Sequence, residues 1–381
     1  MQISGIICEY NPVHLGHQKQ ISHLRAENPD VGIVCLMSGN FVQRGAPAIF
    51  DKAHRAKAAL LCGADLVLEL PVTAALSSAE GFAEAGVRIL ETFCDRLSFG
   101  AESNDMQNIL NTAQALLSDQ FSIQLKQALT SGCSFPSARQ KALEKMGLDA
   151  SILETPNNIL AVEYCKAILS RNYKMKHDVI KREGDYHDSS LNAQNPSATA
   201  LRMQIESGKE WRMYVPEAAF KCFECAEIHH IAYAEQAILY RLRTMTDAEF
   251  EALPYGSEGL WRKLMKNARQ YATLEEILDA TKSKRYTRTR LDRMVMCALL
   301  QITADDLLSP PQYSRVLSLN DKGREILLKA RQSGHFPNIG EKLDHPYQAI
   351  ENRCDDLYGL FAKNKIDSPG LAGKRRLFYC K

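Results

Sequence analysis

The chain has 381 residues, of which 45% are hydrophobic and 24% are charged, and its formal net charge is +2. This length and composition are typical of a globular protein of two or three domains. The small net charge excludes a protein that is strongly basic throughout, so any polyanion-binding surface must be local. No apolar run approaches the roughly 18 residues of a membrane span, and the first residues lack a secretory signal. The eleven irregularly spaced cysteines suggest reduced thiols. We therefore expect a cytoplasmic protein with no membrane partner.

Strands and helices alternate through the first hundred residues. The pattern predicts, in order, a strand at Ile3–Cys8, a helix at His17–Arg25, a strand at Val31–Met37, a helix from an Asp51 N-cap to Cys62, a strand at Leu66–Leu70, a helix at Ala79–Thr92 and a strand at Arg96–Phe99. It then turns helical from about Asn104 to Ala167, and Asp178–Lys181 reads as a last strand. This alternation predicts an α/β fold with a parallel sheet, in which ligands bind beyond the carboxyl ends of the strands.

The turn after the first strand, Glu9–His17, carries the strongest functional signal. Its Pro and Gly residues predict that a buried strand ends at a helix N-terminus. Free backbone N–H groups and the helix dipole favour a phosphate there, and Gly16 allows a ligand to approach the backbone. His14 and His17 share a face of a helical turn and could neutralise charge on an attacked phosphate. Two surface histidines, or two ligands of a metal site, are the alternatives.

A second segment with the features of a phosphate site is Pro196–Arg202. Pro196 predicts an extended start, and Ser197 or Thr199 can cap a new helix that carries Arg202. A hydroxyl-rich helix start followed by an arginine is suited to phosphate binding. A plain N-capped helix with a solvated arginine explains the same residues and stays open.

Positive charge is concentrated late in the chain. Between Trp261 and Arg293 there are ten Lys or Arg against four Asp or Glu. The densest part, with an interleaved tyrosine, is typical of RNA phosphate contacts and a stacked base, although a solvated helix face fits it too. The candidate RNA-binding residues are Lys282, Lys284, Arg285, Tyr286, Arg288, Arg290 and Arg293.

No metal site is predicted. Part of a zinc spacing is present, but no second Cys pair or spaced His pair completes a tetrahedron around Cys222, Cys225, His229 and His230.

Together these segments resemble a known family. The His-x-Gly-His turn and the downstream Ser-Ala-Thr-x-x-Arg are similar to the two ATP-binding segments of the adenylylating nucleotidyltransferase superfamily, which is shared with class I aminoacyl-tRNA synthetases. Further segments narrow the resemblance to the bacterial tRNA(Met) cytidine acetate ligase family: Glu9–Pro12, Met37–Gly45, Gly63–Asp65, Glu69–Pro71, Phe99–Glu102, Pro156–Leu160 and Lys284–Arg288. The resemblance covers nearly all of the chain before about residue 300.

The resemblance implies a Rossmann-like nucleotidyltransferase domain at residues 1–207 and a mainly helical, tRNA-binding region at 208–381. It implies ATP as a substrate, with Mg²⁺ carried by the nucleotide, and His14, His17 and Arg202 as catalytic residues. A small polar loop is expected on the acetate and cytidine side, with Ser38, Asn40, Gln43 and Arg44. The residues implied to bind ATP are Ile7, Cys8, Glu9, Tyr10, Asn11, Pro12, Val13, His14, Leu15, Gly16, His17, Gln18, Lys19, Gln20, Gly100, Asn157, Asn158, Arg182, Ser197 and Thr199.

The reaction that the resemblance implies has two steps. Acetate attacks the α-phosphorus of ATP to give acetyl-adenylate and diphosphate, and N4 of the wobble cytidine of elongator tRNA(Met) then takes the acetyl group and releases AMP. The first step needs positioning and charge stabilisation, which we assign to the two histidines, with Arg202 and Lys19 on the diphosphate. No DNA partner is expected, and the oligomeric state stays open.

Two other functions remain compatible with the sequence. A small-molecule adenylyltransferase needs the histidine turn but not the basic segment. A nucleotide-sensing RNA-binding protein without turnover needs both.

Overall fold

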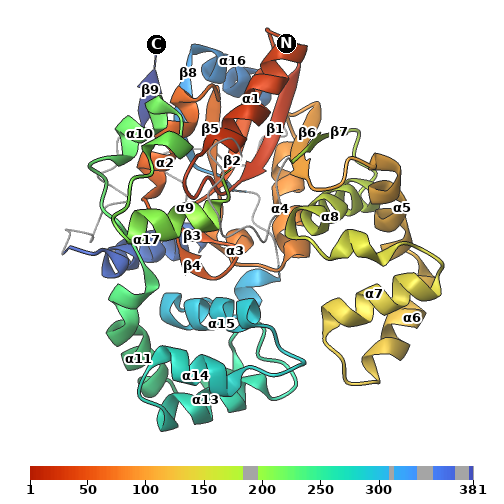
Figure 1. Cartoon of the computed structure of the whole chain (residues 1–381), viewed down its shortest axis with the longest axis vertical. Helices are drawn as coiled ribbons and strands as arrows, with labels where there is room; N and C mark the ends of the chain where they lie inside the picture. The colour runs from red at the N-terminus through yellow and green to blue at the C-terminus, as the bar shows by residue number, and fades with distance from the viewer. Residues whose placement is uncertain (183–195, 309–312, 333–345, 365–376, 381) are drawn as a thin grey trace.

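The computed structural model describes residues 1–182, 196–308, 313–332, 346–364 and 377–380. At its centre lies a seven-stranded sheet with the order β7-β6-β1-β2-β5-β8-β9 (Figure 1). Its strands are β1 (Ile3–Cys8), β2 (Gly32–Ser38), β5 (Leu66–Leu70), β6 (Arg96–Ala101), β7 (Lys176–Lys181), β8 (Val316–Asn320) and β9 (Phe378–Cys380). A two-stranded hairpin, β3 (Phe41–Val42) with β4 (Ala46–Pro47), follows β2.

The first five strands of this sheet along the chain are parallel, which confirms the predicted α/β sheet. β8 is antiparallel to β5, with Leu319 opposite Leu66, and β9 is parallel to β8. Both strands lie beyond residue 207, so the C-terminal region, which is mainly helical as predicted, also completes the sheet. β9 has three residues, which is too short for a periodic pattern to show it.

Helices cover both faces of the sheet, and a further group lies beyond the carboxyl ends of β2 and β5 (Figure 1). The helices are α1 (Leu15–Glu27), α2 (Lys52–Leu61), α3 (Val72–Ala75), α4 (Ala79–Leu90), α5 (Met106–Leu116), α6 (Asp119–Leu129), α7 (Phe135–Lys145), α8 (Pro156–Ser170), α9 (Ala198–Glu206), α10 (Glu217–Phe223), α11 (Glu235–Thr244), α12 (Asp247–Glu251), α13 (Leu260–Gln270), α14 (Leu274–Thr281), α15 (Arg288–Leu300), α16 (Asp321–Gln332) and α17 (Pro346–Tyr358).

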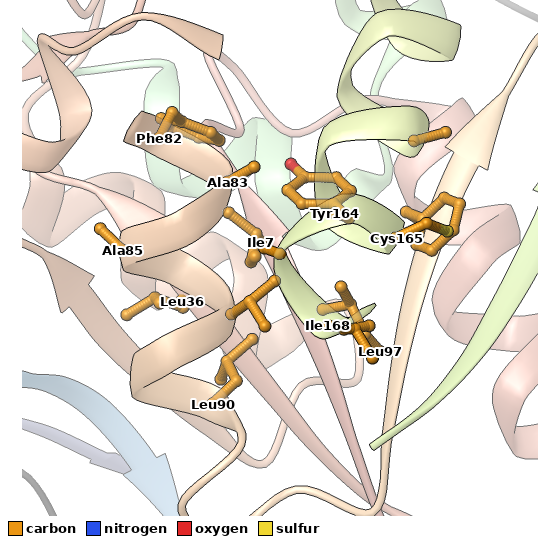
Figure 2. Close-up of a cluster of buried hydrophobic side chains, with 14 of the residues drawn as sticks. Ile7, Leu36, Phe82, Ala83, Ala85, Leu90, Leu97, Tyr164, Cys165 and Ile168 are labelled. Atoms are coloured by element: carbon orange, nitrogen blue, oxygen red, sulfur yellow. The ribbon is translucent and has the colours of Figure 1, made fainter. Parts of the chain in front are cut away.

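Alternate residues of each strand enter different cores, because successive side chains of a strand point to opposite faces. Ile7 of β1 packs with α4 and α8, as Figure 2 shows for Phe82, Leu90 and Ile168. Ile6, its neighbour, packs instead with α1, α2, α9 and α10. The sheet is therefore buried on both faces, as parallel sheets usually are.

The helical group has a core of its own, formed by α11 to α15 and α17. Three residues from the first part of the chain enter this core: Phe41 of β3, Val72 of α3 and Leu76. The β3–β4 hairpin and α3 follow the carboxyl ends of β2 and β5, so the helical group is joined to the edge of the sheet at which ligands are expected.

Several element boundaries differ from the predicted ones. α1 begins at Leu15 with His14 as its N-cap, before the predicted start at His17. β6 continues to Ala101, and β7 begins at Lys176. In the part of the chain that the structure describes, no helix is long and apolar enough to cross a membrane.

Candidate functional site

His14 and His17 form a reciprocal cap at the start of α1. Nδ1 of His14 accepts from the backbone N–H of Gly16 at 3.1 Å, and Nδ1 of His17 accepts from the backbone N–H of His14 at 3.3 Å. The two rings stack with their centroids 3.6 Å apart. The spacing of the two histidines thus builds the helix N-terminus itself, where an anion is stabilised by free N–H groups.

The two imidazoles are neutral donors in this structure. Burial, together with the cations Arg182 and Arg202, lowers the pKa of His14 to about 3, and burial, with His14 and Arg182, lowers the pKa of His17. Because each Nδ1 accepts a backbone N–H, the single ring proton must be on Nε2. Nε2 of His14 is buried and has no hydrogen-bond partner among the described residues. The turn therefore offers N–H donors rather than the positive charge that the sequence suggests.

Two arginines and a glycine lie around the histidine turn. Arg202 is on α9, whose N-cap is Ser197, and it donates to the carbonyl of Asn11 at 2.9 Å and to the hydroxyl of Thr199 at 3.1 Å. Arg182 follows β7, and a Cβ at Gly100 would lie 3.1 Å from its Cγ, so only glycine lets this side chain cross β6 without a shift. The structure thus brings the second predicted segment to the first.

Glu102 connects the end of β6 to the start of α8. Its carboxylate accepts from Thr155 Oγ1 at 2.9 Å, from Asn157 Nδ2 at 2.6 Å and from the backbone N–H of Asn158 at 2.8 Å. Asn158 in turn accepts from the N–H of Ser103 through its side-chain oxygen. The two asparagines, predicted as nucleotide contacts, therefore hold the loop next to Gly100, and their contact with ATP stays a prediction.

The side chains of the predicted ATP-binding stretch divide into core and surface. Ile7 and Val13 are core residues, so they can offer only backbone groups to a ligand. The ring of Tyr10 is buried 4.8 Å from that of His17. Gln20 donates to Ser98 on β6 at 3.2 Å, and Lys19 is exposed. Polar contacts with a ligand thus fall to the backbone of the turn and to its histidines.

The predicted loop on the acetate side is held from inside the protein. Asn40 is buried, and its amide donates to Asp355 and accepts from the backbone N–H of Lys52. The N–H of Gln43 donates to Glu9 at 2.8 Å, which ties the loop to the histidine turn. Ser38 is buried and its hydroxyl has no partner among the described residues, whereas Arg44 is exposed. Asn40 is thus a support of the loop, and a contact of these four residues with substrate stays a prediction.

Arg55 is a supporting residue that the sequence does not reveal. It is fully buried on α2 and donates to the carbonyls of Glu9, Ser38, Gly39 and Phe50. Glu9 and Gly39 are in the loops after β1 and β2, Ser38 ends β2 and Phe50 lies shortly before α2, so one guanidinium fixes both loops. A lone arginine in a helix pattern gives no sign of such a role, because its partners are backbone groups.

The basic segment is largely paired within the protein. Arg288 binds Glu275 at 2.6 Å and Asp292 at 2.8 Å, and Arg285 binds Glu258 at 2.5 Å. Three further members are also engaged: Tyr286 with Glu258, Arg290 with the carbonyl of Tyr255, and Arg293 with the carbonyl of Gln43. Lys282 and Lys284 are exposed. The role of these seven residues in RNA binding stays a prediction, and two of the six cations, Arg285 and Arg288, are paired with acidic neighbours.

The neighbouring helix α13 lies in the basic stretch from Trp261 to Arg293, but its cations are not among the seven candidate RNA-binding residues. Arg262 and Lys266 are exposed on it, while Leu264 and Ala268 are buried in the helical core. The guanidinium of Arg262 lies 4.9 Å from the centroid of the Trp261 ring. Helical periodicity could have revealed this basic face, because basic and apolar residues alternate along α13.

The zinc-like spacing forms other contacts. Cys222 donates to the carbonyl of Ala218, and the ring of His229 stacks on Tyr358 with centroids 4.0 Å apart. Within the described ranges, the side chains grouped closely enough for a metal are His23, Glu27 and Asp178 on α1 and β7. None of these three is among the predicted ATP contacts.

Comparison with known proteins places this geometry in a family. A family model described as HIGH Nucleotidyl Transferase matches residues 1–370. A tRNA(Met) cytidine acetate ligase of Clostridium perfringens is 36% identical over 364 residues, which cover 90% of each chain. That of Clostridium acetobutylicum is 35% identical over 390 residues and 96% of each chain.

Solved structures agree with these sequence relatives. The structure of Thermotoga maritima TmcAL (apo, form I) is 29% identical, covers both chains fully and superposes with a TM-score of 0.91. TmcAL from the same organism bound with alpha-thio ATP superposes with a TM-score of 0.88 at the same identity and coverage. The chain therefore belongs to the tRNA(Met) cytidine acetate ligase family of HIGH nucleotidyltransferases.

Proposed function

We propose that the protein uses ATP to activate acetate and transfers the acetyl group to N4 of the wobble cytidine of elongator tRNA(Met). The observation that carries this proposal is the double-histidine cap, which holds a buried, neutral N–H donor in the turn after the carboxyl end of β1, with Arg182 and Arg202 close by. The relatives' names and the nucleotide-bound neighbour support the choice of substrates.

In the first step, an acetate oxygen bonds to the α-phosphorus of ATP as the bond to diphosphate breaks. Negative charge spreads over the phosphoryl oxygens and the departing diphosphate. Nε2–H donors at His14 and His17 stabilise this charge from fixed positions, and Arg202 neutralises part of it. Since Nδ1 of each ring is held by a backbone N–H, the donors need no reorganisation.

Mg²⁺ is proposed to arrive with ATP. The histidine N–H donors and guanidinium groups around the turn do not coordinate a cation, and the carboxylate of Glu9 already accepts from the N–H of Gln43. The phosphate oxygens and water would therefore hold the ion, and its chemistry would be to neutralise phosphate charge.

In the second step, the cytidine N4 amine bonds to the acetyl carbonyl carbon, AMP departs and the amine loses a proton. The loop from Ser38 to Arg44 is proposed to hold acetate and this amine, because it is tied to the histidine turn through Glu9.

The helical region is proposed to bind the tRNA backbone. We assign the contacts to the exposed cations Arg262 and Lys266 of α13 and to the adjacent Lys282 and Lys284. Arg288, which binds two acidic partners closely, has less charge to offer to phosphate.

Two assays on the purified protein test the reaction: release of AMP, and exchange of diphosphate into ATP. AMP release from labelled ATP is followed with acetate alone, with unmodified tRNA(Met) alone and with both. We expect acetate-dependent exchange of diphosphate into ATP without tRNA, and AMP with N4-acetylcytidine only when both are present. AMP release that does not depend on acetate would contradict the proposal. Transfer of AMP to a small-molecule acceptor would favour an adenylyltransferase, and binding of ATP without turnover would favour a sensor.

A separate variant tests the tRNA surface. Arg262→Ala with Lys266→Ala should weaken tRNA binding and make its dependence on salt shallower, by about 0.7 to 0.9 per lost phosphate contact in the slope of log K against log salt. The matched control is Arg324→Ala with Lys329→Ala, two exposed cations of α16 at the far end of the sheet (Figure 1). Equal losses in both double variants would show that α13 is not the contact surface.

A further inference from the structure

A buried cluster of charged side chains lies behind the Ser38–Arg44 loop. Nζ of Lys52 binds Glu69 at 2.6 Å and Asp355 at 2.7 Å. Arg315 binds Glu69 at 2.9 Å, Asp355 at 3.3 Å and Glu351 at 3.5 Å. The cluster joins α2, β5 and α17 with the residue before β8. It therefore connects the sheet to a helix whose Glu351 and Asp355 come more than 280 residues after Glu69 in the chain. None of these residues is needed in the reaction steps described above.

Asp355 extends the cluster to the loop through Asn40. The amide nitrogen of Asn40 donates to Oδ1 of Asp355 at 3.0 Å, and the amide oxygen accepts from the N–H of Lys52 at 2.9 Å. The backbone carbonyl of Asn40 accepts from the N–H of Ala48 at 2.9 Å, which closes the β3–β4 hairpin. Both ends of the Asn40 side chain are thus fixed, one of them by Asp355.

The backbone of the Ser38–Arg44 loop also packs directly against the charged cluster, so the loop cannot move towards it. A Cβ at Gly39 would lie 2.4 Å from Oε1 of Glu69, so the backbone of the loop rests against this carboxylate. Since Glu69 is itself held by Lys52 and Arg315, the loop sits on a rigid charged base.

The opposite side of α17 packs in the core of the helical region. Ile350, Cys354 and Tyr358 follow one another at four-residue intervals and belong to that core. Glu351 and Asp355, one position further on, turn to the cluster. One helix therefore contacts both the proposed tRNA-binding region and the support of the loop.

We propose that Asp355 is a positioning residue for acetyl transfer: through Asn40 it fixes the Ser38–Arg44 loop and ties that loop to the helical region. This inference rests on the proposed function, in which the loop holds acetate and the cytidine amine. Small displacements of such a loop slow the chemical step, because the reacting atoms leave their near-attack distance.

The test compares Asn40→Ala and Asp355→Asn with a matched control, Asn320→Ala. Asn320 has the same pattern of bonds, donating to the carboxylate of Asp65 and accepting from the N–H of Gly323, but it lies at the amino end of β5. For each variant, acetate-dependent exchange of diphosphate into ATP and acetylation of tRNA(Met) are measured separately. In the first two variants we expect kcat for acetylation to fall about 10- to 100-fold. Because the loop is proposed to hold acetate too, the exchange rate should fall as well, with a raised KM for acetate, while the KM for ATP and the KM for tRNA should stay within about twofold. The control should change neither rate.

A second measurement does not depend on activity. Hydrogen exchange of the amides in residues 38–52 should accelerate about tenfold in Asp355→Asn and in Asn40→Ala, but not in Asn320→Ala. Unchanged exchange in this segment would overturn the positioning role even if the enzyme proved inactive. Unchanged rates of both partial reactions would also overturn it. If the unmodified protein showed no acetate-dependent exchange of diphosphate into ATP, the proposed function would be contradicted. The hydrogen-exchange measurement would then still test whether Asp355 fixes the loop.

Discussion

At the scale of single residues, the two histidines have roles in structure and in chemistry at once. Each Nδ1 satisfies a backbone N–H at the start of α1, and this bond fixes the proton on Nε2. The tautomer needed for phosphate contact is therefore a product of helix capping. Substitutions at these positions change stability and chemistry together unless the cap is replaced.

Asparagine at position 14 separates the two roles. Its side-chain oxygen is a good N-cap, but it lacks the Nε2–H of histidine. We expect His14→Asn to keep the thermal stability of the unmodified protein and to lower acetate-dependent diphosphate exchange about 100- to 1,000-fold. His14→Ala should lose the same activity and also about 1 kcal/mol of stability. Thermal unfolding and exchange kinetics measure both; near-normal exchange in His14→Asn would contradict the assigned role.

The pH dependence of the first step follows from the neutral state of His14. Its pKa of about 3 is below the unfolded value near 6.5, so His14 stays neutral between pH 5 and 8, both in the free enzyme and during the reaction. The profile of kcat/KM for exchange should show no break from this group over that range. The same depressed pKa supplies stability that is present above pH 6.5 and is lost as pH falls towards 3. A break near 6.5 that disappears in His14→Asn would show that the histidine is charged in the free enzyme.

The residue types of the site could be predicted from the sequence, but their partners could not. His14, His17, Arg182 and Arg202 come together as the motifs indicate. Asn40 looks like a substrate contact in the sequence because it is polar and lies in a turn, yet Asp355 and Lys52 occupy its amide. A bond between residues 315 positions apart leaves no local pattern.

At the scale of elements, the β3–β4 hairpin is the contact between the sheet and α15. Gly45 has a φ of +79°, and a Cβ there would lie 2.3 Å from the backbone nitrogen of Arg293. Gly45→Ala should therefore cost more than the roughly 1 kcal/mol of a positive φ alone. Gly132→Ala is the control, because its φ is +74° and no atom lies within 4 Å of the added Cβ. Chemical unfolding of both variants measures the difference; equal losses would mean that the hairpin can move away from α15.

Buried strands and capped helices were the elements that the sequence could predict. The bounds of β1 and β5 agree with the predicted ones because each is an apolar run closed by a turn residue. α2 and α9 begin after the predicted caps Asp51 and Ser197. β3, β4 and β9 have two or three residues each, and α1 uses a histidine as its cap, which capping preferences do not favour.

At the scale of the whole molecule, the buried charge cluster makes stability depend on pH through Glu351. Burial, with Glu69 nearby, raises the pKa of this carboxyl to about 7, although Arg315 and Lys52 face it and lower it in part. A raised carboxyl pKa supplies stability that is complete below the unfolded value near 4.5 and is lost as pH rises through 7. Glu351→Gln, which mimics the protonated form, should unfold at a higher temperature than the unmodified protein at pH 8, by on the order of 1–3 kcal/mol in free energy. Identical pH dependence in both proteins would contradict this.

The sheet also links the two halves of the chain. Residues 1–207 alone would leave the edge of β5 without β8, and all five residues of β5 are buried in the complete protein. Exposed apolar edge strands pair with other chains. We expect this fragment to be insoluble or to elute as large aggregates in size-exclusion chromatography. The complete chain should not aggregate under the same conditions. A monomeric fragment with a cooperative thermal transition would show that the sheet is stable without β8 and β9.

The pairing of β5 with β8 has a consequence for the order in which the protein is made. On the ribosome, Glu69 leaves the exit tunnel 246 residues before Arg315, and Lys52 leaves it 303 residues before Asp355. During that interval the first strands can form while the support of the Ser38–Arg44 loop is incomplete. A nascent chain can thus acquire its nucleotide-binding turn early, but the arrangement proposed for acetyl transfer is complete only when synthesis is nearly over.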